Sequence, residues 1–453
     1  MKKLFDIIYK KSPIWFQNFI ISVYGYKLYK QRYGKEYLFW LKYYKEKDYS
    51  DLENELANQE KEFISFFNYV SKQSPFYKDL YKNISNVKTI KDLTKLPVVN
   101  KEMFRKKLED VYTISGNIGL TSFTGGTTGK ALKVIFTNED FQKRMAYLDA
   151  FKWRVGIEDV FKVKKATFSG RSIVFNQNTK IFWRNNFAYN QRLYSTFHLT
   201  EENLPYYISN LNKFKPEVVN GFVSSIYEMA NFILRKSIKL SFKPKAIFTT
   251  SETLTNVHRE VIEKVFKCKI YNQYASAEGA PFITECVQGN LHYNLDTGII
   301  ERDNNGGMIV TSFTTSGTPL IRYDIGDIVE FKQGVCECGS SHPLVNSISG
   351  RKVDYLHSKI SGKISLSHLA DVIKGNPNSI IKMQFVQKSI DEIDVRIVVD
   401  MNLFIPEHET TIMAEMIYRF GDEVKINIIK VDDIEKEKSG KYSIIKNLIA
   451  NKT

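Results

Sequence analysis

Between about residue 118 and residue 350, short β-rich runs alternate with helical segments, and this alternation constrains the fold more than any other feature. The runs ALKVIF, KAIFTT and KIYNQY are rich in β-branched and aromatic residues, whereas LTNVHREVIEKVF has the apolar spacing of a helix. The runs GGMIVTSF and DIVEFKQG predict a more antiparallel part. We therefore expect an α/β architecture with mixed sheets and helices.

The segments on either side differ in character. The first 115 or so residues have apolar positions at three- and four-residue intervals, which predicts helices. Near the other end, DEIDVRIVVD and VKINIIKV have strand character and flank the helical HETTIMAEMIYRFG. Because 453 residues exceed what one hydrophobic core supports, we expect a large N-terminal domain, residues 1–350, and a small α+β domain, residues 351–453.

Composition limits the partners of this chain. The net charge of +15 comes from scattered basic residues, without a helix-turn-helix, finger or RNA-recognition signature, so nucleic acid is not expected as a partner. Two interpretations of the charge remain open: lysines spread over solvated faces, or an anionic partner. Four cysteines in so long a chain do not make a disulfide scaffold.

The N-terminal stretch MKKLFDIIYKKSPIWFQNFIISVYGYKLYKQRYG mixes aromatic, aliphatic and basic residues. Lysines interrupt its apolar run and no small-residue cleavage site follows, so it does not read as a signal peptide. No apolar run in the chain reaches the roughly 18 residues of a membrane span. The stretch is either a helix packed on the protein's own core or a peripheral contact with an anionic membrane. We expect a cytoplasmic protein.

The stretch TSFTGGTTGKALKV has the glycines, hydroxyls and lysine of a phosphate-binding loop. A Walker loop requires a glycine five positions before Gly129 and a hydroxyl residue after Lys130, but these positions hold Thr124 and Ala131. A Gly/Thr loop of another kind can still wrap phosphates with backbone N–H groups. A plain hairpin turn is the alternative.

Four further motifs follow in order: YASAE, RYDIGD, GRKVD and SGK. An aromatic such as Tyr274 can stack on adenine, and a carboxylate such as Glu278 can hold Mg²⁺. Asp327 follows a glycine turn and is suited to accept hydrogen bonds from ribose hydroxyls. Taken singly, each motif has a plain structural explanation, but the five in this order are specific.

This motif series resembles that of the adenylate-forming ligases, within them the phenylacetate–CoA ligase branch, and most of all the CapK-type proteins of capsular polysaccharide loci. The resemblance implies two half-reactions: a carboxylate attacks the α-phosphate of ATP and releases pyrophosphate, and an acceptor then takes the acyl group from the acyl-adenylate. It also implies a small C-terminal domain that rotates between them about a hinge, here Lys352, Val353 and Asp354.

Carried over by position, the resemblance assigns residues to the nucleotide. It implies that the β- and γ-phosphates are held by Thr124, Gly125, Gly126, Thr127, Thr128, Gly129 and Lys130. Tyr274 would stack on adenine, and Ala275 and Ser276 are carried over as further nucleotide-binding residues. Glu278 would ligate Mg²⁺ and Asp327 would bind ribose. Arg351 would contact ribose or phosphate, and Lys441 would stabilise the transition state.

One motif departs from the family pattern. Where the family has a glycine after the tyrosine and a hydroxyl residue before the glutamate, this chain has Ala275 and Ala277. Ser276 is a candidate to supply the missing hydroxyl. A descendant that binds the nucleotide without catalysis is therefore an alternative to an active ligase.

Three cysteines and a histidine lie in one segment. Cys286 and His292 are six apart and Cys336 and Cys338 two apart, which fits a tetrahedral structural zinc site; the alternative is buried apolar side chains. Some phenylacetate–CoA ligase-like proteins carry such a site. His342 is a substitute ligand, and Cys268 is expected in the core.

The substrate is the least determined feature. By analogy the acyl pocket involves Phe197, His198 and Gly221, with core packing as the alternative for the two aromatic residues. A basic segment with Arg171, Arg184 and Arg192 is a candidate to meet an anionic substrate. The resemblance implies a small-molecule or sugar-linked carboxylate, and an amine or the thiol of CoA as acceptor.

Overall fold

The structure is a computed structural model. It describes residues 8–116, 118–123, 132–171, 173–175, 179–349, 355–360, 362–365, 369, 372, 379–436 and 443–449. The phosphate-loop residues Thr124–Lys130, Arg351, the hinge residues Lys352–Asp354 and Lys441 lie outside the described residues. The chain divides into two compact units, which are treated separately: the first holds residues 1–23, 161–270 and 349–453, and the second holds residues 24–160 and 271–348.

The second unit is built on an antiparallel sheet. In order across the sheet, its strands are β12 (Gly298–Arg302), β13 (Gly307–Ser312), β14 (Leu320–Lys332), β15 (Leu344–Ser349), β11 (Leu291–Tyr293), β10 (Ile283–Glu285) and β9 (Ile270–Tyr274). The short strand β1 (Val99–Asn100) adds to β14 in parallel. A separate hairpin, β2 (Leu120–Phe123) with β3 (Lys133–Phe136), flanks the phosphate-loop sequence.

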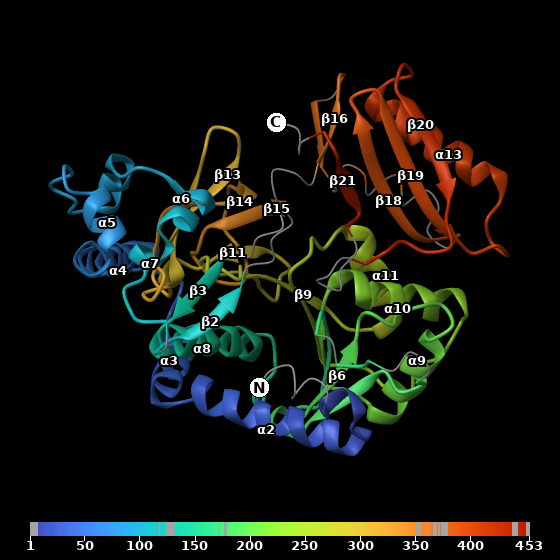
Figure 1. The fold of residues 1–453 in the computed structure, drawn as a ribbon, viewed down its shortest axis with the longest axis horizontal. Helices are drawn as coiled ribbons and strands as arrows, with labels where there is room; N and C mark the ends of the chain where they lie inside the picture. Colours follow the sequence, from blue (N-terminus) through green and yellow to red (C-terminus); the bar gives the residue numbers. More distant parts are fainter. Residues whose placement is uncertain are drawn as a thin grey trace. The chain divides into compact units, whose positions relative to one another are not determined.

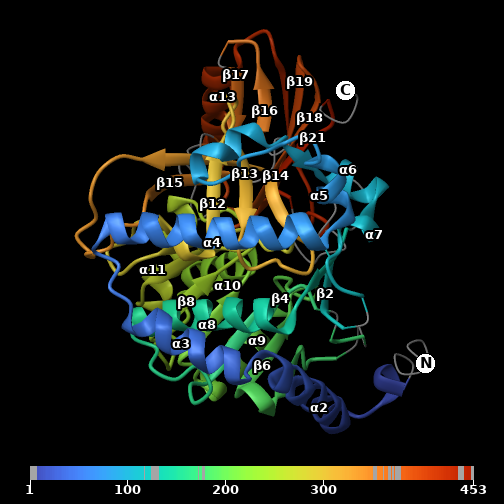
Figure 2. The same cartoon turned by 90° about the vertical axis from the view of Figure 1, so that its left-hand side faces the viewer.

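Helices cover this sheet, and Figure 2 shows α4 lying across strands β12 to β14. The helices of this part of the chain are α2 (Ile14–Arg32), which begins in the first unit, α3 (Lys35–Glu46), α4 (Leu52–Gln73), α5 (Pro75–Leu80), α6 (Lys101–Lys106), α7 (Leu108–Val111) and α8 (Asn138–Arg154). Asp51 caps α4 by accepting a hydrogen bond from the backbone N–H of Asn54, and α4 ends before Pro75. Phe63, Phe66 and Val70 of α4 are buried in the core of the unit because they recur at helical spacing.

The first unit contains a mostly parallel sheet. Its strand order is β8 (Ala246–Thr249), β7 (Val218–Gly221), β4 (Lys165–Ser169), β6 (Gln191–Ser195) and β5 (Trp183–Asn186), with β5 antiparallel to β6. The connecting helices are α9 (Leu204–Phe214), α10 (Val223–Arg235) and α11 (Asn256–Phe266). Strands β7 and β8 are buried over almost their whole length, as expected for a parallel sheet with covered faces.

A smaller α+β part of the same unit has its own core. Its strands run in the order β20 (Lys425–Lys430), β19 (Glu392–Val399), β18 (Ile380–Ser389) and β21 (Ile445–Asn447), beside a hairpin of β16 (Tyr355–Ser358) and β17 (Gly362–Ser365) (Figure 1). Helix α13 (Pro406–Phe420) connects the parallel strands β19 and β20 and buries Ile412, Met416 and Phe420. The expected α/β fold with an α+β C-terminal part is confirmed.

Candidate active site and metal centre

The candidate nucleotide residues of the second unit lie where β9 ends. Tyr274 is the last residue of β9, and its hydroxyl donates a hydrogen bond of 2.6 Å to the carboxylate of Asp327 in β14. Burial raises the pKa of Tyr274 well above its ordinary value, and the negative charge of Asp327 raises it further. Tyr274 is therefore a neutral hydrogen-bond donor whose hydroxyl is oriented by the carboxylate of Asp327.

The loop after β9 carries Glu278, whose side chain is buried. Ser276 closes this loop: its hydroxyl oxygen accepts hydrogen bonds from the backbone N–H groups of Gly279 at 3.1 Å and Ala280 at 3.0 Å. The hydroxyl proton of Ser276 is not used in these two bonds, so it can still be donated. Ala275 is half-buried in the same loop, and Ala277 is exposed.

Gly279 is required by the close packing of this loop. Its φ is +99°, which strains any residue with a side chain, and a Cβ there would lie 2.4 Å from Thr315 Cγ2 and 2.8 Å from Phe136 Cε1. Phe136 is the last residue of β3, the strand that follows the phosphate-loop sequence. The glutamate loop and one stem of the phosphate loop are therefore in direct contact.

Arg144 of α8 binds the backbone of the loop that carries Glu278. This arginine was not identified as a site residue from the sequence. Its Nη1 donates hydrogen bonds to the carbonyls of Gly279 at 2.9 Å and Ala280 at 3.1 Å, and to Thr314 Oγ1 at 2.7 Å. Burial lowers the pKa of Arg144 to about 10, so the guanidinium stays charged at neutral pH. No motif signals this residue, because it reaches the loop only through the packing of a helix.

The threonine-rich segment after β13, residues 313–318, is hydrogen-bonded to β3, the strand that follows the phosphate-loop sequence. Thr318 Oγ1 accepts a hydrogen bond from the backbone N–H of Ile135 at 2.8 Å and donates one to its carbonyl at 3.1 Å. Asp140 at the start of α8 accepts a hydrogen bond from Ser316 Oγ at 2.9 Å. These bonds fix β3, the strand that follows the loop sequence Thr124–Lys130.

In the first unit, the candidate acyl-pocket residues follow β6 and β7. His198 Nδ1 lies 2.8 Å from Ser195 Oγ, and its ring stacks on Phe182 with 5.5 Å between ring centroids. Burial lowers the pKa of His198, and the positive charges of Lys436 and Arg184 lower it further, so the ring is neutral at pH 7. Phe197 is half-buried beside it.

Gly221 ends β7, and a Cβ there would lie 2.3 Å from the carbonyl oxygen of Phe168. The glycine is thus required by strand packing.

The basic segment does not present free cations along its length. Arg184 is buried and donates to Gln17 and to two backbone carbonyls. Arg192 donates to Asn185 and Asn210 and stacks on Phe214. Arg171 is exposed. The first two therefore hold the protein together, which does not support their interpretation as substrate contacts.

Lys436, from the C-terminal part, reaches the candidate acyl residues and was not indicated by any motif. Its Nζ donates to the backbone carbonyl of Thr196 and lies 3.7 Å from Glu228 Oε2. Glu228 Oε1 in turn lies 3.0 Å from Lys382 Nζ of β18. Burial lowers the pKa of Lys436, with a further lowering by the charge of Lys382 that Glu228 opposes. Thr196 directly precedes Phe197 and His198, so the C-terminal part contacts the backbone of the candidate acyl site.

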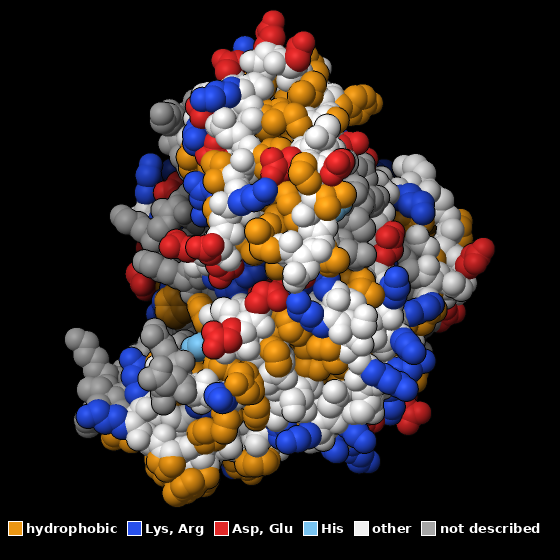
Figure 3. Space-filling model, turned by 90° about the vertical axis from the view of Figure 1, so that its right-hand side faces the viewer, with side chains coloured by type: hydrophobic (Ala, Val, Ile, Leu, Met, Phe, Trp, Pro, Cys, Tyr) orange, Lys and Arg blue, Asp and Glu red, His pale blue; other side chains and the backbone are white. Residues whose placement is uncertain are grey.

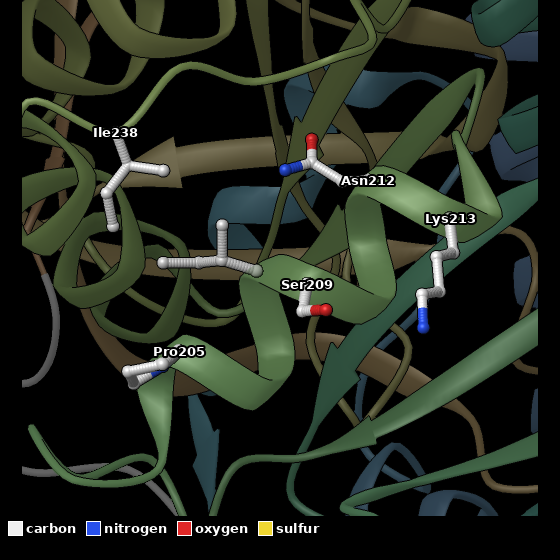
Figure 4. A pocket seen from close by; sticks show the side chains of 6 residues that line it. Pro205, Ser209, Asn212, Lys213 and Ile238 are labelled. Carbon is white, nitrogen blue, oxygen red and sulfur yellow. The ribbon is translucent and has the colours of Figure 1, made fainter.

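A shallow pocket elsewhere in this unit contains none of the candidate site residues. It lies along α9 and is lined by Pro205, Ile208, Ser209, Asn212, Lys213 and Ile238 (Figure 4).

The four candidate metal ligands form one cluster in the second unit. The ligand atoms of Cys286, His292, Cys336 and Cys338 all lie within 4.8 Å of one another. The Sγ atoms of Cys286 and Cys336 are 3.7 Å apart, and Cys338 Sγ is 3.5 Å from His292 Nε2. Tetrahedral Zn²⁺ with its usual bond lengths requires about 3.8 Å between sulfurs and about 3.5 Å between sulfur and nitrogen. The donor set therefore fits the ion, whereas a disulfide needs about 2 Å.

Surrounding groups orient this cluster. His292 Nδ1 lies 3.0 Å from the backbone carbonyl of His342, which leaves Nε2 free to bind a metal. The side chain of His342 is not a member of the cluster, because its Nε2 lies 2.8 Å from Glu55. The pKa of Cys336 is lowered, since hydrogen bonds from Cys338 and His292 outweigh its burial. Cys268 is half-buried against the core of the first unit, and burial raises the pKa of its thiol to about 12.

The cluster is linked to the nucleotide residues through two strands. Cys286 follows β10, His292 lies in β11, and β10 pairs with β9 so that Ile283 stands opposite Tyr274. A metal in the cluster would thus fasten the strand pair next to Tyr274.

Comparisons with known proteins identify the family. The CapK C-terminal domain model matches residues 356–448. Protein CapK from Staphylococcus aureus is 40% identical over 453 residues, which covers 97% of this chain and 98% of that protein. Crystal structures of 2-hydroxyisobutyryl-CoA ligase are similar in fold. The structure in the postadenylation state, in complex with R3-HIB-AMP, has a TM-score of 0.68 and 15% identity, and the match covers 88% of this chain and 90% of that one. The structure with 2-HIB-AMP and CoA in the thioesterification state has a TM-score of 0.53 and 16% identity, covering 88% and 91%.

The sequence motifs, the fold and the likeness to Protein CapK agree. This chain belongs to the CapK family and has the fold of the adenylate-forming ligases.

Proposed function

We propose that this protein activates a carboxylic acid with ATP and transfers the acyl group from the resulting acyl-adenylate to an acceptor. The observation that carries the proposal is the contact between Tyr274 and Asp327, two motif residues 53 positions apart, within the fold of adenylate-forming ligases. Glu278 lies four residues after Tyr274, and its side chain is buried. This arrangement supports an adenine- and ribose-binding site.

In the proposed first half-reaction, a carboxylate oxygen forms a bond to the α-phosphorus of ATP, and the bond to pyrophosphate breaks. Thr124–Lys130 bind the leaving phosphates, Asp327 accepts hydrogen bonds from the ribose, and Tyr274 stacks on adenine. Arg351 contacts ribose or phosphate, and Lys441 neutralises charge in the transition state. Glu278 would hold Mg²⁺, which supplies positive charge against the phosphates.

In the second half-reaction, a nucleophile forms a bond to the acyl carbon and AMP leaves. We propose an amine acceptor, which gives an amide, in the assembly of a capsular or other surface polysaccharide, because the chain belongs to the CapK family. The thiol of CoA is the second candidate, since a ligase of similar fold is known with CoA bound. Phe197, His198 and Gly221 are our candidates for the acyl pocket, and Lys352–Asp354 for the hinge between the half-reactions.

We propose that the reaction takes place in the cytoplasm, where ATP is available.

The test is ATP–pyrophosphate exchange with pooled aryl acetates, fatty acids, amino acids and uronic acids. Exchange with one pool supports the proposal and identifies the substrate class, and adding CoA or an amine to that reaction then identifies the acceptor. Asp327→Ala should abolish exchange, whereas Asp432→Ala, at an exposed aspartate, should leave it unchanged. ATP binding without exchange in any pool, including sugar-linked acids, would favour a protein that binds the nucleotide without catalysis.

We further propose that the Cys286, His292, Cys336 and Cys338 cluster binds a structural Zn²⁺ ion. Cys336→Ser should release one zinc per chain and lower the melting temperature, while Cys268→Ser should keep the metal. A wild-type protein purified with no zinc and unchanged in stability by chelators would contradict this site.

A further inference from the structure

Helix α2 is attached to the first unit by polar side chains as well as by the apolar contact of Ile21 with the core. Its protein-facing side carries polar residues: Gln17 accepts a hydrogen bond from Arg184, Asn18 Oδ1 from the backbone N–H of Asn185 at 2.8 Å, and Ser22 Oγ from that of Phe187 at 3.0 Å. Surface helices normally bury apolar residues and expose polar ones. In α2 the inner side combines the core contact of Ile21 with these hydrogen bonds to β5 and to Phe187, the residue after it.

The outer side of α2 is apolar. Trp15, Phe19 and Val23 are 71%, 57% and 53% exposed, and they lie on one stripe because they are four residues apart. Phe187, 70% exposed, adjoins this stripe, since its backbone is bonded to Ser22. Hydrophobic side chains gather at the lower end of the face in Figure 3, where α2 lies in Figure 1. Single exposed apolar residues are ordinary, but a row of them marks a contact surface.

The charge around this stripe identifies the partner. Between Asp6 and Glu36 the chain has no acidic residue and six basic ones: Lys10, Lys11, Lys27, Lys30, Arg32 and Lys35. An apolar stripe with tryptophan and phenylalanine, flanked by lysines, fits the boundary between acyl chains and anionic headgroups. A two-fold contact with a second copy would instead place this basic segment against itself.

We propose that α2 docks the protein, through Trp15, Phe19 and Val23, on an anionic phospholipid bilayer. The helix lies in the plane of the surface and does not cross it. Within the described part of the chain, no helix is long and apolar enough to span a membrane. The proposal does not depend on the catalytic one, because none of these side chains belongs to the candidate active site.

The test uses the full-length protein and vesicles of phosphatidylcholine, with or without phosphatidylglycerol, in a sedimentation assay. We expect binding to the phosphatidylglycerol vesicles that weakens with salt, and a blue shift of tryptophan fluorescence. The double variant Trp15→Glu with Phe19→Glu should bind about tenfold more weakly or worse. Tyr418→Glu, at a residue of α13 that is 81% exposed, is the matched control and should bind like the wild type.

A second variant tests the charges without touching the apolar stripe. Lys11→Gln with Lys27→Gln should weaken binding to anionic vesicles and leave the melting temperature unchanged. The proposal is overturned if the wild type ignores anionic vesicles, or if the Trp15 and Phe19 variant binds as the wild type does. It is also overturned if that variant only converts a dimer into a monomer, because the stripe would then be a contact between two copies.

Discussion

Single residues show what a sequence can and cannot reveal about this site. Tyr274, Glu278 and Asp327 stand out in the sequence because the chemistry of a nucleotide demands their side-chain types, and the structure brings Tyr274 and Asp327 together. Arg144 and Lys436 do not stand out, because they act through packing between elements far apart in the chain. The contacts of Arg144 and Lys436 can be recognised only in the tertiary structure.

Tyr274→Phe tests the hydroxyl separately from the ring. The variant keeps a ring to stack on adenine but loses the 2.6 Å bond that orients Asp327. We expect the KM for ATP to rise about fivefold to tenfold, the equivalent of one hydrogen bond, with a smaller change in kcat. Tyr271→Phe in the same strand is the control. An unchanged KM for ATP in steady-state kinetics would mean that Asp327 needs no orientation by Tyr274.

The buried side chain of His258 should make the free energy of unfolding depend on pH. Burial lowers its pKa from 6.5 to about 4 in the folded protein. The unfolded chain therefore binds the proton more tightly, so the free energy of unfolding is full above pH 6.5 and falls between pH 6.5 and pH 4. The loss from this group is about 3 kcal/mol.

The check is urea unfolding between pH 4 and pH 7. His258→Gln should be less stable at pH 7, because a tightly packed ring is lost, but its stability should fall less steeply over this range. His408→Gln, in a half-exposed part of α13, should retain the slope of the wild type. If both variants keep that slope, another group is responsible for the acid sensitivity.

At the scale of elements, the loop between β9 and β10 shows how packing fixes a functional segment. Gly279 lies against Thr315 and Phe136, Arg144 binds its carbonyl, and Ser276 closes the turn. The alternating pattern of the sequence predicted strands and helices here, and the fold class is confirmed. The pairing of β1 with β14 was not foreseen, because nothing local relates segments more than 200 residues apart.

Gly279→Ala should disturb this loop strongly. The added Cβ meets Thr315 and Phe136 in a backbone conformation that is already unfavourable for alanine, so we expect a loss of about 1–3 kcal/mol or more in unfolding free energy. Pyrophosphate exchange should fall further than this loss explains, since Glu278 is displaced.

Gly156→Ala is the matched control. Its φ is +94°, but no atom lies within 4 Å of the added Cβ. Gly156→Ala should lower the unfolding free energy by about 1 kcal/mol, because alanine is unfavourable at this φ, and should leave ATP–pyrophosphate exchange unchanged. Equal effects of the two substitutions on stability and exchange would show that the contacts of Gly279 do not position Glu278.

At the scale of the whole molecule, the first unit is held together by buried charges. Glu228 of α10 pairs with Lys382 of β18 and lies near Lys436, and all three side chains are largely buried. Arg235 and Asp400 form a second ion pair between the same two parts, at 2.6 Å. The sequence predicted a separate C-terminal part but not these attachments, since each joins residues that are unremarkable in their own segments.

Glu228→Ala should leave two buried lysines without their shared carboxylate. Removing one partner of a buried pair costs about 3–5 kcal/mol, so we expect unfolding at lower denaturant and faster proteolysis of residues 355–449. Glu202→Ala, at an exposed glutamate, should resemble the wild type. Wild-type stability and protease resistance in Glu228→Ala would mean that this ion cluster does not fasten the C-terminal part.

The bond between His342 and Glu55 has a consequence for folding during synthesis on the ribosome. It joins residues 287 positions apart, so α4 emerges from the ribosome long before the partner of Glu55 exists. At about 5–20 residues per second, that interval lasts roughly 15 to 60 seconds. Gln59 likewise cannot form its hydrogen bond to the hydroxyl of Tyr293 until that residue has been synthesised. During this time Phe63, Phe66 and Val70 of α4 have no sheet to cover, so the nascent chain depends on chaperones or on transient local contacts until its second half is made.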